Sequence, residues 1–418
     1  MDVLRQSNRE ISIDDRLDII RINISISVLA GLVCNFAGVL PDSIKYPFYA
    51  ISILFGYATI FFSLMYNAVN SKTKLYLASW MFVVMYMIIV GVVRISNDKS
   101  SFDLGNFLAQ DIRYVMYFGI GIILSDKRYF SFFNSLVICL GFLSIIFGII
   151  AIANYRFDYS AILLGSREGI WTISYILWWL SGDVFQYLYP YARIVQKQKV
   201  IGYGSLFTYF FFGLLFLKRS SLINSIFIVV ITEVVRGKTG YAEKENPENR
   251  REGFGFFGLI CILLIALILI KIPYTSVLIQ QLILRFSSQG GFMEYDRAME
   301  ARGYFDSVGL MRTIVGEGIG SYYTTYRKIN ALHTGMYNTY YKGGIIYSFF
   351  VYISISRAFR GFYKARIVNR YYAVCICACS SFALSMLYEG SWTYTFGIMV
   401  ISAAIAYCIN SNAGGDVP

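Results

Sequence analysis

The sequence predicts an all-α polytopic membrane protein with about 12 transmembrane helices and one long extramembrane loop. Apolar residues make up 57% of the chain, charged residues make up 15%, and the mean hydropathy is +0.55. A soluble globular protein carries about 25% charged residues. The apolar residues also come in blocks, and the block Phe254–Ile270 contains no charged side chain. A soluble fold is therefore excluded.

The blocks are long enough to cross the hydrocarbon core of a bilayer as helices, because only helices satisfy their own backbone polar groups there. Met1–Arg21 is charged throughout, so we expect no cleavable signal peptide. The expected spans are 22–41, 46–66, 76–93, 108–125, 129–153, 171–191, 200–217, 221–235, 254–272, 338–356, 371–388 and 392–409.

Basic residues gather between these blocks, and the positive-inside rule sets their expected side. With both termini in the cytoplasm, most basic clusters fall inside, and the net charge of +12 needs no nucleic-acid partner. The inner clusters are Arg5, Arg9, Arg16 and Arg21; Lys72 and Lys74; Lys127 and Arg128; Arg193, Lys197 and Lys199; Arg236, Lys238, Lys244, Arg250 and Arg251; and Arg357, Arg360, Lys364, Arg366 and Arg370.

Two groups of unusual residues fall within the expected spans. Asp111 and Arg113 lie in the span 108–125, and we expect them to pair or to sit near the interface, because buried charges are costly. All seven cysteines also lie in spans, which argues against disulfides. Cys375 and Cys379 share one face of a helix and are expected to be packing residues.

The expected domain organisation is a membrane domain over 1–272 with a cytoplasmic loop at 236–253, a periplasmic subdomain over 273–338, and a second membrane domain over 339–418. The long outer segment has an ordered composition and is expected to contain a helix or two. It is rich in arginine against the positive-inside bias, with Arg285, Arg297, Arg302, Arg312 and Arg327. Guanidinium groups bind phosphate oxygens bidentately, so this cluster and Lys218–Arg219 predict a pyrophosphate site.

The outer segment contains three further candidate features. Gly316, Gly318 and Gly320 allow the backbone to approach a ligand or a neighbouring helix closely. His333 is the only histidine and precedes the span at 338–356, which favours a functional role. Tyr322 and Tyr323 are candidates for stacking on sugar rings. The spacing of acidic residues indicates no metal site, and no cofactor is expected.

These residues form a pattern that resembles the O-antigen polymerase and ligase family of membrane glycan transferases. Arg297, Arg302, the glycines 316–320 and His333 precede an apolar span containing Gly343–Gly344, and Lys218–Arg219–Ser220 resembles the family's other arginine motif. The resemblance implies a metal-independent, inverting glycosyltransferase of the bacterial inner membrane that acts at the periplasmic face on undecaprenyl-pyrophosphate-linked oligosaccharide.

The resemblance also implies residue roles. Arg219 and Arg297 would bind the donor pyrophosphate and stabilise the charge on the leaving group, and His333 would orient or deprotonate the acceptor hydroxyl. Lys218, Arg302 and Arg312 would assist in binding. We expect a polymerase of lipopolysaccharide biosynthesis, for which a chain-length regulator is a candidate partner. The alternatives are an O-antigen ligase that transfers glycan to lipid A-core, a lipid-linked oligosaccharide flippase, and a structural membrane protein.

Overall fold

The computed structural model describes residues 13–35, 42–66, 68–102, 104, 107–154, 184–215, 219–238, 296–323, 332, 335–363, 369–387 and 395–412. This part of the chain is all-helical apart from turns and one isolated antiparallel bridge between Phe102 and Ser321. Its helices are α1 (Ile13–Asn35), α2 (Asp42–Met65), α3 (Ser71–Asn97), η2 (Lys99–Ser101), η3 (Phe107–Ile112), α5 (Arg113–Leu124), α6 (Lys127–Asn154), α9 (Val184–Pro190), η4 (Tyr191–Val195), α10 (Lys199–Leu215), α11 (Arg219–Lys238), α14 (Asp296–Ser307), α15 (Leu310–Val315), α16 (Gly335–Tyr363), α17 (Arg370–Ser385) and α18 (Thr395–Asn412).

Each expected span that the structure describes overlaps a helix, but the count of 12 spans stays a prediction. The span at 254–272 lies outside the described residues, and the span at 171–191 is described only from Val184 onwards. Among the described residues, four helical segments are long and apolar enough to cross a membrane, namely Asp14–Cys34, Tyr46–Met65, Ser71–Asn97 and Lys127–Ile146. Arg113–Leu124 and Phe396–Ser411 are shorter apolar helices. The described part of the chain is thus helical, and its apolar helices indicate a membrane protein.

The first helix begins earlier than expected. α1 starts at Ile13, before the predicted span boundary at 22, and its first turn contains Asp14 and Asp15. These carboxylates stabilise the helix because the N-terminal end of a helix dipole is positive. Hydropathy finds the apolar part of a helix and misses a charged turn that extends it.

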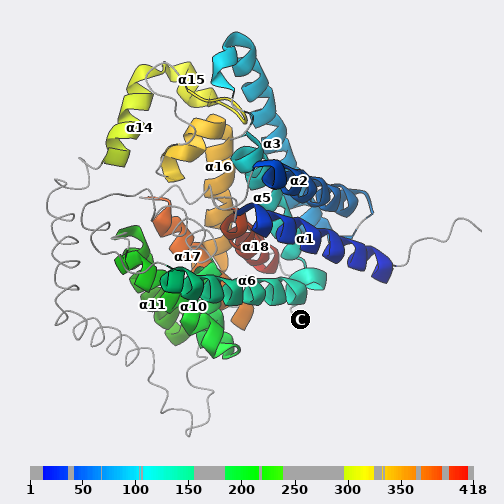
Figure 1. The fold of residues 1–418 in the computed structure, drawn as a ribbon, viewed down its shortest axis with the longest axis vertical. Coiled ribbons are helices and arrows are strands. Elements are labelled where there is room, and N and C mark those ends of the chain that lie inside the picture. The colour runs from blue at the N-terminus through cyan, green and yellow to red at the C-terminus, as the bar shows by residue number, and fades with distance from the viewer. Residues whose placement is uncertain are drawn as a thin grey trace, which may run out of the picture.

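The centre of the bundle is built from helices whose surfaces are buried on nearly all sides. α5 is buried almost throughout and packs on α18, which in turn packs on α16 and α17 (Figure 1). The thiol of Cys408 on α18 lies within hydrogen-bonding reach of Cys375 and Cys379 on α17. The described cysteines are free thiols, and this trio packs between two core helices as the shared helix face predicted.

The outer helices have the opposite character, because large apolar side chains on them face outwards. Examples are Leu29 on α1, Leu54 and Phe61 on α2, and Phe82 and Met85 on α3, all of which are exposed. An apolar surface of this extent would promote aggregation in water, whereas it suits contact with lipid. The surface chemistry therefore agrees with the hydropathy of the chain.

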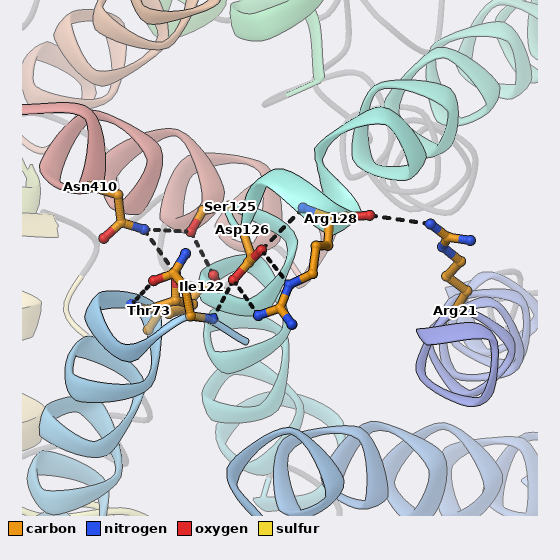
Figure 2. Close-up of polar contacts among 8 residues, drawn as sticks. Arg21, Thr73, Ile122, Ser125, Asp126, Arg128 and Asn410 are labelled. Atoms are coloured by element: carbon orange, nitrogen blue, oxygen red, sulfur yellow. Dashed lines mark hydrogen bonds and ion pairs between the residues drawn. The ribbon is translucent and has the colours of Figure 1, made fainter. Parts of the chain in front are cut away.

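One end of the bundle is held together by polar contacts between segments that we expected on the cytoplasmic side (Figure 2). The Asp126 carboxylate, in the turn between α5 and α6, accepts hydrogen bonds from the backbone N–H of Asn70 at 2.5 Å and from Arg128 Nε at 3.1 Å. Arg21 of α1 donates to the Arg128 carbonyl at 3.2 Å. This cluster joins α1, the start of α3 and the turn between α5 and α6.

The C-terminal helix α18 reaches the same end. Asn410 Nδ2 donates to Thr73 Oγ1 at 3.0 Å and to Ser125 Oγ at 3.4 Å (Figure 2). The opposite end of α3 leads to Ser101, whose carbonyl accepts from the Tyr322 N–H of the predicted outer segment at 2.8 Å. Segments predicted inside and outside thus occupy opposite ends of α3.

Candidate functional site

Within the described residues 296–323, the predicted outer segment forms two helices, α14 and α15, where a helix or two was expected. They lie at the top of Figure 1, beside the upper ends of α3 and α16. Arg297 is in the first turn of α14, and Arg219 is the first residue of α11, but their side chains lie outside the described residues, as do Lys218 and His333 altogether. Arg302 on α14 is exposed. The distances among the predicted catalytic groups therefore stay open.

The glycine loop, residues 316–320, lies between α3 and α16 and contacts both helices. Gly316, Gly318 and Gly320 all have positive φ values, of 86°, 83° and 80°, a region that favours glycine because it has no Cβ. A Cβ on Gly318 would lie 2.1 Å from the backbone nitrogen of Gly91 in α3, and one on Gly316 would lie 2.6 Å from the nitrogen of Gly344 in α16. The glycines thus allow close approach to two neighbouring helices.

Every backbone N–H group of this loop donates to a protein acceptor. The N–H groups of residues 316 to 319 donate to the carbonyls of Arg312, Tyr341, Lys342 and Met87 at 2.7–2.9 Å, and that of Gly320 donates to the Asp111 carboxylate at 2.9 Å. A loop that cradles phosphate presents free N–H groups to its ligand. Binding of substrate by these three glycines stays a prediction, and in this structure their amides serve packing.

Helix α16 breaks where it meets the loop. Gly343 and Gly344 have non-helical dihedral angles, with Gly344 at a φ of 55°. The break frees the carbonyls of Tyr341 and Lys342, which accept from Glu317 and Gly318 as described above. Glycine is needed at the break because a Cβ on Gly344 would meet the Ile314 carbonyl at 2.0 Å. Two glycine segments thus interlock through their backbones.

A carboxylate without solvent exposure anchors the loop from within. Glu317 accepts hydrogen bonds from Arg312 Nε and Nη2 and from the Tyr304 hydroxyl, all at 2.7 Å. Burial, together with the neighbouring carboxylate, raises the pKa of Tyr304, so this hydroxyl stays protonated and donates. The hydrogen bonds to Glu317 raise the pKa of Arg312. Phosphate binding by Arg312 stays a prediction and would require this pair to open.

A buried ion pair between Lys342 and Asp111 lies beside the loop and is joined to it by one hydrogen bond. Lys342 Nζ lies 2.8 Å from Asp111 Oδ1, while Asp111 Oδ2 accepts from Gly320 N–H. We expected Asp111 to pair with Arg113 or to sit near the interface, and the structure gives it Lys342 as its partner. The guanidinium of Arg113 instead lies 4.9 Å from the ring centroid of Tyr49 and donates to the Gly31 carbonyl at 3.3 Å.

The two predicted sugar-stacking residues, Tyr322 and Tyr323, are buried. Lys342 Nζ lies 5.1 Å from the centre of the Tyr322 ring, and Arg312 lies at the same distance from that of Tyr323. The Tyr323 hydroxyl donates to Ser307 at 2.7 Å. Lys342 thus lies over the ring of Tyr322 and Arg312 over the ring of Tyr323, and stacking of these rings on sugar stays a prediction.

Sequence reasoning missed the contacts that hold this end of the molecule together. Asp111, Lys342, Glu317, Tyr304 and Tyr341 form its charged and aromatic interior. Asp111 gave a signal, because an acidic residue inside an apolar span requires a partner. The identity of that partner was hidden by its distance along the chain, since Lys342 follows 231 residues later.

The comparisons with known proteins do not place the chain in a family. No family model, no curated protein and no solved structure matches it.

Proposed function

We propose that this protein is a bacterial inner-membrane glycosyltransferase that polymerises undecaprenyl-pyrophosphate-linked repeat units of an O-antigen or related surface polysaccharide at the periplasmic face. One observation supports a site for a lipid-linked substrate. Tyr304 of the arginine-bearing helix α14 donates to Glu317 of the glycine loop, and the loop is hydrogen-bonded to α3, to α16 and to Asp111, which pairs with Lys342. A polar element attached to apolar helices that are long enough to cross a membrane suits a substrate that has a lipid tail and a charged pyrophosphate.

The proposed reaction needs neither a metal ion nor a sugar nucleotide. The acceptor hydroxyl oxygen attacks the anomeric carbon of the donor, and the bond from that carbon to the pyrophosphate oxygen breaks with inversion. His333 takes the hydroxyl proton, and the leaving undecaprenyl pyrophosphate keeps the bonding electron pair. Arg219 and Arg297 stabilise the charge that develops on it, with Lys218 and Arg302 in support.

The test compares arginine variants in a strain that lacks the gene. Arg297→Ala and Arg219→Ala should abolish long glycan chains at normal protein levels, and lysine should restore little because it lacks the bidentate fork. Arg360→Ala is the matched control, since Arg360 is exposed near the end of α16, in a cluster expected on the cytoplasmic side. This variant should keep the wild-type glycan ladder.

The readouts are a lipopolysaccharide gel and an immunoblot of the membrane fraction. A polymerase predicts that the deletion strain accumulates lipid A-core with zero or one repeat unit. Complete loss of glycan from the core would instead identify a ligase. A normal ladder from both alanine variants would refute the proposed role of the arginines, and normal chains in the deletion strain would refute both enzyme functions.

A further inference from the structure

The short helix α15 meets α3 well below the end of α3. Tyr86 Oη donates to the Val315 carbonyl at 2.9 Å, and the Met87 carbonyl accepts from Ile319 N–H at 2.9 Å. α3 continues from Met87 to Asn97. At a rise of 1.5 Å per residue, the contact lies about 15 Å from the end of the helix.

At this depth the surface of α3 has the character of a lipid-facing helix. Met85 and Ile89 flank the two contact residues, and both are 60% exposed. They belong to the segment Ser71–Asn97, which is long and apolar enough to cross a membrane. The end of α15 is therefore level with apolar side chains that contact lipid if α3 spans the bilayer.

α15 itself has one polar and one apolar side. Arg312 faces inwards to Glu317, whereas Leu310 and Met311 are 75% and 73% exposed, and Ile314 is also exposed. An amphipathic helix with apolar side chains on its open face is suited to a membrane interior or interface. The C-terminal end of α15 lies against the part of α3 that carries the exposed Met85 and Ile89, because Tyr86 of α3 donates to the Val315 carbonyl.

The glycine loop 316–320, which follows α15, also meets the requirements for a position in the hydrocarbon core. Irregular backbone is tolerated there only where its polar groups are satisfied by protein or line a water-filled cavity. All five N–H groups of the glycine loop 316–320 donate to protein acceptors. The loop is buried throughout, and its carboxylate is paired with Arg312.

We propose that α15 and the glycine loop form a re-entrant element, which enters the leaflet on the α14 side and places Leu310, Met311 and Ile314 against lipid acyl chains. The segment expected to lie wholly outside would then be partly embedded, with α14 held at the membrane boundary. This inference concerns membrane position and does not depend on the proposed glycosyl transfer.

Native methionines allow a test on the full-length protein in membranes. The membranes are treated in parallel with a water-soluble methionine oxidant and with a lipophilic carbene reagent confined to the bilayer, and modified residues are mapped by mass spectrometry. Met311 should behave as Met85 does, with carbene labelling and slow oxidation. The control for the water side is Arg302→Met, because Arg302 is exposed on the adjacent helix α14. This introduced methionine should oxidise at least tenfold faster than Met311.

Each other outcome contradicts the proposal. Rapid oxidation of Met311 without carbene labelling would place α15 in water. Protection of Met311 from both reagents would show that protein covers the face, and crosslinking would then identify a second copy of the chain.

Discussion

Replacing Glu317 by glutamine removes the charge that anchors the glycine loop and keeps the side-chain size. The carboxylate accepts three hydrogen bonds at 2.7 Å, two from Arg312 and one from Tyr304. A glutamine amide turns one acceptor into a donor that faces a guanidinium. Removing one partner of a buried pair costs about 3–5 kcal/mol. The Arg312 side chain is 31% exposed and partly solvated, so we expect a loss of roughly 2–4 kcal/mol in the stability of the loop.

The assay is hydrogen exchange measured by mass spectrometry on peptides that cover 310–323. The amides of 316–320 are protected by hydrogen bonds to Arg312 of α15, to α3, to α16 and to Asp111, so they exchange only when the loop opens. The expected loss corresponds to roughly 30- to 1000-fold faster exchange. Asp306→Asn is the matched control, because Asp306 is an exposed carboxylate on α14. If Glu317→Gln exchanged no faster than this control, the ion pair would not anchor the loop.

Three further experiments test the packing of the glycine loop, the role of His333 as a base, and the orientation of the chain in the membrane. Gly318→Ala should open the loop and reduce the amount of folded protein in detergent, because the added Cβ would lie 2.1 Å from a backbone nitrogen of α3. Its control is Gly303→Ala, whose Cβ meets nothing within 4 Å and which should be neutral or stabilise α14 by about 0.5–1 kcal/mol. Equal melting temperatures of the two variants would refute the steric argument. His333→Ala should reduce glycan chain formation by about 10²–10⁴-fold, and an inactive His333→Gln would favour proton transfer over orientation; a normal ladder from His333→Ala would exclude both roles. A cytoplasm-specific reporter should be active when fused after Gly240 and silent after Gly290, and the reverse pattern would invert the predicted topology.

The helices could be predicted from the sequence because lipid-facing segments must be apolar and internally hydrogen-bonded. Continuous apolar blocks locate α2, α3 and α6 directly. The start of α1 could not be found in this way, since its first turn is charged. Hydropathy reports where a helix is apolar, and helix capping and dipole interactions decide where it begins.

The interior of the candidate site was much less predictable. Two possibilities were expected for Asp111 and Arg113, pairing or a position near the interface, and Asp111 pairs with Lys342. A pair between Asp111 and Arg113 is disfavoured because residues two apart do not share a helix face. The actual partner, Lys342, depends on how α16 packs against the segment of Asp111, which local patterns do not encode. The alternating glycines were a correct sign of close backbone approach, yet only the structure shows that the neighbours are α3 and α16. The surroundings of His333, Arg219 and Arg297 stay predictions.

The ion pair between Asp111 and Lys342 also constrains how the protein is made. The two residues are separated by 231 positions, so the lysine does not exist when the segment of Asp111 leaves the ribosome. At a synthesis rate of 5–20 residues per second, the carboxylate waits roughly 10–50 s for its partner. During that interval an acidic group in an apolar segment has no countercharge from α16. Chains that terminate before Lys342 keep this defect permanently, and membrane quality-control proteases should remove them faster than the full-length protein.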